Sequence, residues 1–559
     1  MDHRPTFAEM FTPKLVTVLR EGYGAKQIKA DALAGLTVAI VALPLSMAIA
    51  IGSGAKPEQG LYAAVVGGFI VSMLGGSRFQ IGGPAGAFIA LVAATILKFG
   101  FDGLLIATFM AGFLLLAIGY LRLGTYIKYI PHPVLVGFTA GIAVIIFAGE
   151  IRDLFGLQIE NEPSAVIPRI VALWNVRATF NLYAVGLSAL CLAMMVGLKH
   201  LAPRFPGMLA AVVTGALMTW MFELPVETIG TRFGGIPGSL PAPALPVFEL
   251  SRLLELVPAA IAIALLGGIE SLLSAVVADG MTGRRHRSNC ELVAQGYANI
   301  ASALFGGLCV TGTIARTATN VRAGAHGPVA GMMHAIILLV FMIFAAPLAS
   351  YVPLAALAAV LAIVAWNMIE REQFIHILRH DKGEAGVLLA TFLLTVFRDL
   401  TEGIAVGVTL GAILFMHRMA EIVQVSTQEN VLDEDKADGS PNQRKPYNAN
   451  IDDEVVVYRI AGAFFFGAAG TIAAVLDRIG TAPRAFVLDL GSVPFADATA
   501  AQTLLAFVAK AMKHGTRVYV AGASPAVRHV LWSNGLNAEM VTYTPSVEEA
   551  RNASTASKS

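Results

Sequence analysis

The stretch TGTIARTATN, which runs from Thr311 to Asn320, decides the fold. It places an arginine, Arg316, and four threonines between two long apolar segments. A guanidinium at the centre of a bilayer costs about 2.5 to 3.5 kcal/mol on insertion scales, so other parts of the protein must offset that cost. The stretch is also shorter than the roughly 20 residues that a helix needs to cross a bilayer. We therefore expect a helix that starts inside the membrane and is supported by surrounding protein.

The composition of the chain indicates a membrane protein. Of the 559 residues, 56% are hydrophobic and 14% are charged, whereas an ordinary soluble domain has about 25% charged residues. The net charge of +1 gives no reason to expect a nucleic-acid partner. The three cysteines are scattered in or beside apolar segments, which suggests neither a disulfide framework nor a metal site. We expect no cofactor, and we find no motif for a nucleotide-driven pump.

Apolar segments recur from Leu33 to about Met416. Hydropathy predicts about fourteen spans, near residues 33–51, 60–75, 84–98, 103–121, 133–149, 181–199, 207–222, 256–279, 291–305, 314–322, 327–349, 353–368, 384–398 and 401–417. Lysine and arginine gather in alternate loops, such as those at 122–128, 199–204 and 284–287. The positive-inside rule then predicts a multi-pass protein of the cytoplasmic (inner) membrane with both termini in the cytoplasm. Residues 1–30 form a cytoplasmic amino-terminal segment without the pattern of a removable signal peptide.

The spans contain a repeated pattern. In both halves a Gln-Gly pair lies early in a span that ends in Gly-Gly, at residues 59–76 and 295–307. Seven or eight residues later a short segment begins, at Pro84 and at Ile314. If each repeat holds seven spans, the second repeat is inverted relative to the first, as in many secondary transporters. The alternative is coincidence, because glycine and the Gln-Gly pair are common.

The two short segments have the chemistry of an anion site. Each follows a glycine-rich turn, in QIGGPAGAF (80–88) and in TGTIARTATN (311–320). The start of a helix leaves about four backbone N–H groups unpaired and carries about half a positive charge. Two such starts that face each other in the membrane would attract an anion, and the threonines can satisfy loose backbone groups or offer hydroxyls to a ligand.

Several stretches together resemble the SulP family of anion transporters, the relatives of the sulfate permeases, pendrin and prestin. They are ADALAGLTVAIVALPLSMAIAIGSGAKPEQGLYAAVVGG, GGSRFQIGGPAGAF, LLGGIESLLSAVVADGMTG and TGTIARTATNVRAG. The first span contains a Pro-Leu pair, and in this it resembles the first span of the bacterial branch that includes a C4-dicarboxylic acid transporter. The resemblance implies an all-α membrane protein of about fourteen spans, arranged as a seven-plus-seven inverted repeat with a core and a gate domain. The transport domain would cover residues 31–420, with repeats at about 31–225 and 255–420.

The resemblance also implies where the substrate binds, between the starts of the third and tenth helices. Residue by residue, that site falls on Ala85, Gly86, Ala87, Phe88, Thr313, Ala315, Arg316 and Thr317, with Leu45 and Ile49 facing it from the first span. Leu45 and Ile49 are aliphatic where prestin-like members have glutamine and an aromatic residue. This departure weakens any transfer of halide chemistry. For Arg316 the alternatives are a side chain that reaches the membrane interface or one bonded to backbone carbonyls.

Glu270 is a second charge inside a span, and Ser274 lies four residues later on the same helical face. In SulP relatives this position holds an acidic residue linked to cation coupling, and a sodium-coupled relative has aspartate followed by threonine. Glu270 and Ser274 depart from that pair, so we favour proton coupling and keep sodium as the alternative. A structural hydrogen bond or an ion pair with Arg316 is the other interpretation of Glu270.

The carboxyl-terminal part has a different character. Residues 421–453 are polar and predict a flexible linker. Residues 454–548 alternate strand and helix patterns, resemble a STAS domain and are followed by a flexible tail at 549–559. Ala498 follows Asp497 where related proteins carry a phosphorylated serine, so a phosphorylation switch is doubtful. The STAS domain would serve as a dimerisation or stability module, giving a homodimer, or would bind a cytoplasmic protein.

The sequence thus predicts a transporter in the lipid bilayer rather than an enzyme. We expect secondary active transport of a small anion, such as sulfate, bicarbonate or a C4-dicarboxylate, together with a proton. Sodium symport, anion exchange, a passive anion channel of the same fold and a signalling receptor are the alternatives.

Overall fold

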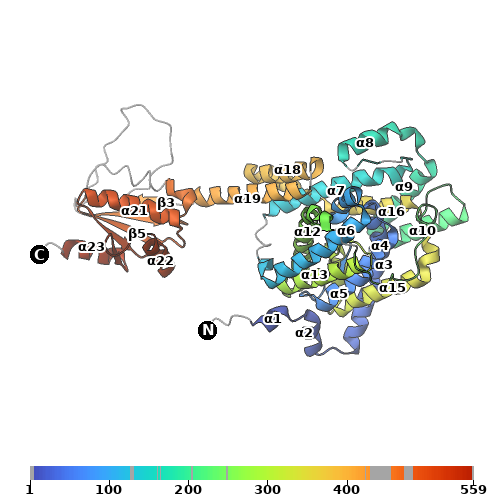
Figure 1. Ribbon diagram of the computed structural model, residues 1–559, viewed down its shortest axis with the longest axis horizontal. Coiled ribbons are helices and arrows are strands. Elements are labelled where there is room, and N and C mark those ends of the chain that lie inside the picture. Colours follow the sequence, from blue (N-terminus) through green and yellow to red (C-terminus); the bar gives the residue numbers. More distant parts are fainter. Residues whose placement is uncertain are drawn as a thin grey trace. The chain divides into compact units, whose positions relative to one another are not determined.

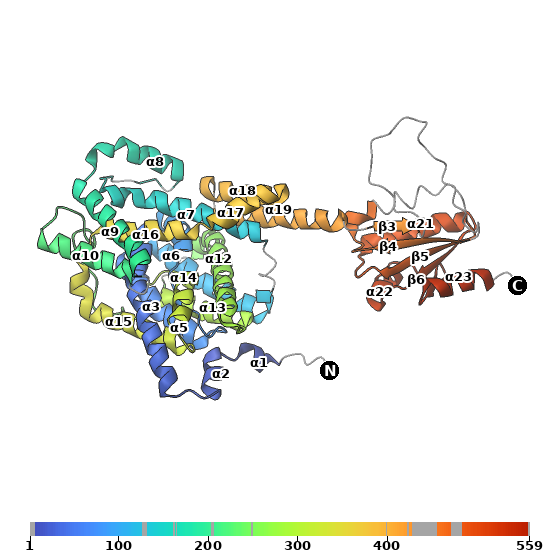
Figure 2. The ribbon, with the colours of Figure 1, turned by 180° about the vertical axis from the view of Figure 1, so that it is seen from behind.

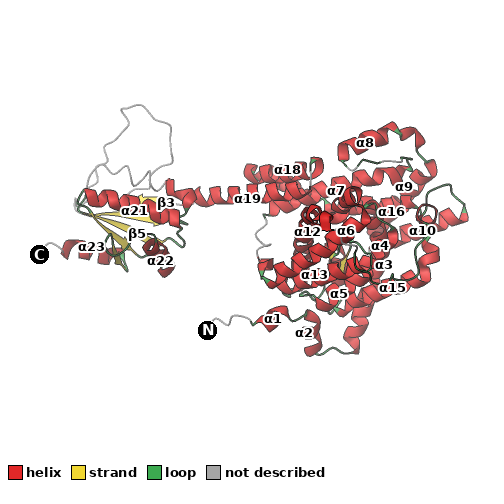
Figure 3. Cartoon of the chain, in the orientation of Figure 1, coloured by secondary structure: helices red, strands yellow, loops and turns green. Residues whose placement is uncertain are grey.

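The computed structural model describes residues 6–125, 131–159, 162–163, 165–202, 206–246, 250–398, 400–421, 424–427, 455–470 and 483–556. The chain divides into two compact units, Met1–Thr409 and Leu410–Ser559. Figure 3 shows that helices build nearly all of the first unit, whereas the second contains a sheet. Most of the predicted linker, residues 428–453, lies outside the described residues, as do residues 1–5.

Every predicted span coincides with helix. The helices of the first repeat and its flanking segments are α1 (Phe7–Phe11), α2 (Lys14–Arg20), α3 (Ala25–Gly52), α4 (Pro57–Tyr62), η1 (Ala63–Gly67), α5 (Gly68–Leu74), η2 (Gly86–Phe88), α6 (Ile89–Tyr120), η3 (Leu123–Thr125), α7 (His132–Phe155), α8 (Val166–Asn175), η5 (Arg177–Thr179), α9 (Leu182–Leu201), α10 (Gly207–Met221) and α11 (Ile229–Phe233). Those of the second are α12 (Leu250–Thr282), α13 (Ser288–Leu304), α14 (Ile314–Arg322), α15 (Val329–Ala349), α16 (Leu354–Met368), α17 (Arg371–His380), α18 (Lys382–Phe397) and α19 (Leu400–Glu421). Among the described residues, eight helices are individually long and apolar enough to cross a membrane.

Two predicted spans, the third and the fourth, lie within η2 and α6. Gly100 interrupts α6 with a φ of 74° and a ψ of 176°. Glycine adopts such a positive φ without the steric cost that other residues meet. The chain therefore turns at Gly100 and forms two spans where hydropathy had predicted two.

Contacts between the membrane helices divide them into two groups, whose members are labelled in Figure 1. In the first, α13 and α12 pack on α6, and α15 packs on α3. In the second, α16 and α18 pack on α7, and α10 packs on α9. The first group contains the first four spans of each repeat, and the second group contains later spans. This is the division into core and gate domains that the resemblance implies.

The repeated Gln-Gly pairs mark close helix packing. A Cβ atom on Gly60 of α4 would overlap the Ser46 carbonyl of α3, and one on Gly296 of α13 would lie 2.8 Å from the Gly112 carbonyl of α6. Only glycine permits backbones to approach this closely. The same sequence feature therefore serves the same packing role in both halves of the core.

The two halves also meet through their backbones. Strand β1 (Gly82–Gly83) pairs with β2 (Thr311–Gly312) in antiparallel register, with Gly82 opposite Gly312 and Gly83 opposite Thr311. These short strands immediately precede the two short helices that the repeat pattern singled out. Figure 2 shows α14 among α3, α12 and α13.

The second unit contains a five-stranded sheet in the order β3 (Gln424–Thr427), β4 (Val455–Ala461), β5 (Ala485–Ser492), β6 (Arg517–Ala521) and β7 (Thr542–Thr544). Strands β4 to β7 are parallel, and β3 is antiparallel to β4. Helices α21 (Ala498–Lys513) and α22 (Pro525–Ser533) cover one face, and α23 (Val547–Ala556) covers the other. Because both faces are covered, β5 is apolar and buried along most of its length.

Two expectations for this unit need correction. Residues 424–427 were expected in the flexible linker, but they form β3, because the edge of β4 offers unpaired backbone groups. Residues 549–556 were expected in a flexible tail, but they belong to α23, and Ala550 is fully buried against the sheet. The small buried side chains of Ala550 and Ser554 let this polar helix lie close to the strands.

Candidate anion-binding site

Two helix starts lie beside the β1–β2 pair. The segment η2 begins after Ala85, and α14 begins after Thr313; both cap residues have extended backbone. Neither Ala85 nor Thr313 makes a side-chain capping hydrogen bond. The first N–H groups of both helices are therefore left without side-chain caps, which gives donors and partial positive charge for a negatively charged ligand.

The threonines of the 311–320 stretch hold this backbone in place. Thr311 Oγ1 donates to the Gly267 carbonyl of α12 at 2.8 Å, and Thr313 Oγ1 donates to the Ile81 carbonyl at 3.3 Å. Thr317 Oγ1 accepts a hydrogen bond from the Ile81 N–H at 3.1 Å. Backbone groups that leave regular structure inside a membrane need such partners. Three of the four threonines therefore form hydrogen bonds that stabilise the backbone around the β1–β2 pair.

Arg316 is buried in the core, with 1% of its surface exposed. Its Nη2 lies 3.2 Å from Ser46 Oγ of α3 and 3.3 Å from the Pro84 carbonyl. Its Nε and Nη1 have no hydrogen-bond partner in the described protein. A guanidinium carries five N–H donors, and unpaired buried donors are costly. Arg316 therefore bonds partly to backbone, as one alternative had it, and still has donors free for a ligand.

Glu270 and Ser274 lie on α12 beside α14. Ser274 Oγ donates to Thr317 Oγ1 at 2.9 Å, which links the two helices. Oε2 of Glu270 is buried without a hydrogen-bond partner in the described protein. Glu270 and Arg316 interact electrostatically, yet no ion pair within 4.0 Å joins them in the described part of the chain. The structure therefore places a carboxyl close to the arginine without neutralising it by direct contact.

The remaining predicted residues form an apolar wall. Leu45, Ile49, Ala85, Ala87 and Phe88 are buried in one hydrophobic cluster. The wall brings the first span together with the start of η2. It also leaves the polar groups of the site in surroundings of low polarity, where electrostatic interactions are stronger than in water.

Gly86 and Ala315 occupy the two edges of this arrangement. A Cβ atom on Gly86 would be 3.6 Å from Ile146 of α7 and 3.6 Å from Met368 of α16, so Gly86 faces the gate helices. Ala315, in the first turn of α14, is exposed. The predicted residues thus extend from the buried core to its boundary with the gate.

Two polar residues were missed by sequence reasoning. Ser46 contacts Arg316, and the Gln80 amide donates to Ser271 Oγ at 2.5 Å while its Oε1 is buried without a partner in the described protein. A sequence signal did exist. Ser46 is the hydroxyl residue inside the apolar run VALPLSMAIA, and Gln80 lies two residues before the first glycine of the turn.

Comparisons with known proteins agree with the geometry. The model of the sulfate permease family matches residues 28–391, and that of the STAS domain matches residues 446–550. The putative sulfate transporter YvdB of Bacillus subtilis is 38% identical, over 92% of this chain and 95% of the relative. The bicarbonate transporter BicA of Picosynechococcus is 30% identical over 90% of both chains.

A solved structure shows the same fold. The murine anion transporter Slc26a9, solved in an inward-facing state, superposes with a TM-score of 0.85 at 17% identity, covering 100% of this chain and 96% of that one. At this identity the likeness concerns the fold alone. The inverted arrangement of core and gate, the two helix starts beside the β1–β2 pair and the family matches lead to one conclusion: this chain is a multi-pass membrane protein of the sulfate permease (SulP) family with a carboxyl-terminal STAS domain.

Proposed function

We propose that this protein carries a small anion across the membrane, with the anion held between the starts of η2 and α14. The observation that carries the proposal is the buried Arg316 guanidinium, whose Nε and Nη1 have no hydrogen-bond partner in the described part of the chain, together with two helix starts that lack side-chain caps. Sulfate and bicarbonate fit this chemistry, because both present several oxygen atoms to N–H donors. The names of YvdB and BicA support the same two substrates, and a C4-dicarboxylate is a third.

The charges near the site suggest how uptake is driven. Two helix starts contribute about one positive charge together, Arg316 contributes another, and ionised Glu270 removes one. Protonation of Glu270 would strengthen the binding of an anion. We therefore propose proton symport, in which the core domain moves against the gate and carries both ions. Both termini would lie on the cytoplasmic side of the inner membrane.

Sodium symport is the second candidate, and one arrangement favours it. Ser274 Oγ and Thr317 Oγ1 lie 2.9 Å apart, and Ser274 shares α12 with Glu270, whose Oε2 has no hydrogen-bond partner among the described residues. Oxygen atoms of this kind bind hard cations. An exchanger or a passive channel of the same fold would need no coupling cation. For the STAS domain we propose dimerisation, with binding of a cytoplasmic protein as the alternative.

Glu270→Gln in proteoliposomes tests the coupling. The amide keeps the size of the side chain and cannot titrate, so we expect accumulation driven by an inward proton gradient to fall to the level of passive exchange. Labelled sulfate, bicarbonate and succinate would be compared at two external pH values, with and without sodium. Glu255→Gln is the matched control, because Glu255 lies on the same helix and is exposed.

The outcomes separate the candidates. Proton-driven accumulation that survives Glu270→Gln unchanged would rule out the coupling role. Accumulation that requires sodium in the parent protein would replace proton by sodium symport. Flux that only follows the anion gradient, without accumulation, would indicate a channel, and saturable binding without flux would favour a receptor.

A further inference from the structure

A large apolar groove lies between α3, α10 and the end of α15. Its volume is about 560 Å³. Fourteen residues line it, and Trp220 and Tyr351 are the two whose side chains carry a hydrogen-bonding group. We call it the α3–α10 groove. Its walls belong to membrane spans, so its surroundings are lipid and neighbouring helices, and an empty groove of this size would deprive its lining of packing partners.

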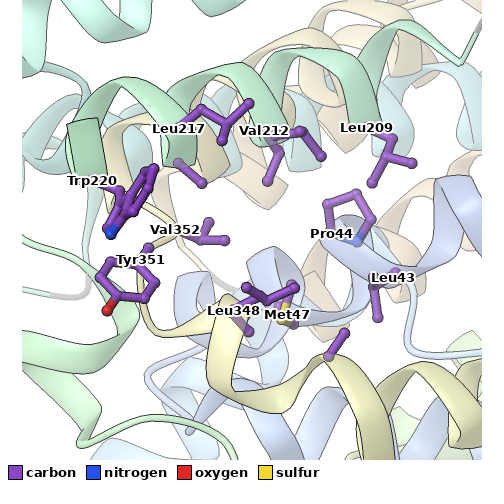
Figure 4. A pocket seen from close by; sticks show the side chains of 14 residues that line it. Leu43, Pro44, Met47, Leu209, Val212, Leu217, Trp220, Leu348, Tyr351 and Val352 are labelled. Carbon is purple, nitrogen blue, oxygen red and sulfur yellow. The ribbon is translucent and has the colours of Figure 1, made fainter.

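The groove has a polar end and an apolar end. Figure 4 shows Trp220 and Tyr351 together at one end, with Leu209 and Pro44 at the other. Tryptophan and tyrosine concentrate at the boundary between hydrocarbon and water in membrane proteins. The Trp220 end therefore lies at an interface, and the Leu209 end lies deeper in the hydrocarbon.

The length of the groove matches one leaflet. Leu209 and Trp220 lie eleven positions apart on α10, which is about 16 Å along a helix that rises about 1.5 Å per residue. The hydrocarbon core of a bilayer is about 30 Å thick, so the groove spans about half of it. The basic loop at 199–204 precedes α10, so the positive-inside rule places the Trp220 end in the outer leaflet.

The charge at the polar end selects among lipids. Glu223 lies three residues beyond Trp220 and is exposed, and it forms no ion pair within the described residues. Glu227 follows and is 57% exposed, with Arg232 at 3.6 Å. An unpaired negative charge at a lipid interface attracts a headgroup that contains an ammonium group. It repels a headgroup whose phosphate is not accompanied by an ammonium group.

We propose that the α3–α10 groove binds one acyl chain of an outer-leaflet phospholipid with an ammonium headgroup, such as phosphatidylethanolamine. The acyl chain of the lipid packs between α3 of the core and α10 of the gate. On α3 it contacts Leu43, Pro44 and Met47, on turns that also carry Leu45 and Ile49. The lipid therefore bridges two helices that must shift against each other if the core moves, as in the proposed function.

Photolabelling measures this binding without any transport assay. The full chain would be placed in nanodiscs of phosphatidylethanolamine or of phosphatidylglycerol, each with a photoactivatable diazirine on an acyl chain, and adducts would be mapped by peptide mass spectrometry. We expect adducts on α10 and α3 at the groove, more with phosphatidylethanolamine. Val213→Trp fills the groove, so labelling there should fall roughly tenfold, the change that a loss of about 1.4 kcal/mol produces.

Val196→Trp is the matched control, because Val196 on α9 is 47% exposed and Val213 is 46% exposed, and only Val213 lines the groove. The control should keep the groove adducts. If labelling in the parent protein is no stronger at the groove than along α9, the groove is not a lipid-binding site. If phosphatidylglycerol labels the groove as strongly as phosphatidylethanolamine does, the proposed preference for an ammonium headgroup is wrong. Crosslinks to a second copy of the chain in place of lipid adducts would overturn the lipid as occupant. Because these readouts do not involve an anion, they separate a failure of the groove from a failure of the transport proposal.

Discussion

The proposed binding of the anion depends most on the side chain of Arg316. The variant Arg316→Lys tests whether this guanidinium contacts the anion. Lysine keeps the positive charge but loses the planar fork of N–H donors. A hydrogen bond to a charged group contributes about 1.5 to 3 kcal/mol, so we expect sulfate to bind at least roughly tenfold more weakly. Binding of radiolabelled sulfate to the purified protein measures this change.

Arg322→Lys provides the comparison, since Arg322 lies in the last turn of the same helix and is exposed. It should leave the affinity for sulfate unchanged. Equal affinity in the parent protein and in Arg316→Lys would mean that the guanidinium does not contact the anion.

Sequence reasoning could identify the residues whose chemistry is out of place, but not their partners. Arg316 and Glu270 stand out because charges are rare inside spans. The contact between Ser46 and Arg316 depends on how α3 packs against α14. These residues are 270 positions apart, so no local sequence pattern can predict their contact. The roles of the predicted site residues in substrate binding remain predictions.

At the scale of elements, the amino-terminal helices dock on the core through charges. Glu21, which follows α2, pairs with Arg78 in the loop after α5. The hydrogen bond from Arg78 lowers the pKa of the Glu21 carboxyl. A group with a lowered pKa in the folded state stabilises that state above its unfolded pKa, about 4.3 for glutamate, and the stabilisation is lost as the pH falls through the lowered value.

We therefore expect Glu21→Gln to lower the melting temperature at pH 7 by about 1 to 2 °C, because a half-exposed ion pair contributes little. The difference from the parent protein should vanish in acid. A double-mutant cycle with Arg78→Gln checks the coupling. If the two single effects simply add at pH 7, the pair makes no contribution to docking.

Elements were predictable where local composition decides them. Hydropathy located every span, because a helix in lipid must be apolar over its own length. The pairing of β1 with β2 could not be predicted in register, since it joins residues about 230 positions apart. Strand β3 was missed because its four residues are stabilised by a neighbour that lies beyond a long polar segment.

At the scale of the membrane unit, movement of the core against the gate can be blocked by a crosslink. A Cβ atom on Gly52 of α3 would lie 3.1 Å from Leu361 Cδ1 of α16. We expect oxidation of the Gly52→Cys, Leu361→Cys protein, with the three native cysteines replaced by serine, to stop most anion uptake. Dithiothreitol should restore it. Uptake by the oxidised and reduced proteoliposomes measures the effect.

The Gly215→Cys, Ala356→Cys pair is the control, because a Cβ atom on Gly215 of α10 would lie 3.2 Å from Ala356 Cβ of α16 and both helices belong to the gate. This crosslink should form without stopping uptake. Full uptake by a completely crosslinked Gly52–Leu361 protein would contradict movement of the core relative to the gate at this contact.

The β1–β2 pair has a consequence for how the protein would treat its substrate on the two sides of the membrane. Hydrogen bonds between Gly83 and Thr311 and their neighbours hold the two helix starts together, so the donors proposed to bind the anion would move together and keep their spacing. A ligand that arrives from outside then meets the same set of donors as one that arrives from inside. We expect nearly equal intrinsic dissociation constants for the anion in both orientations, and any preference for uptake over efflux would come from the ion gradients.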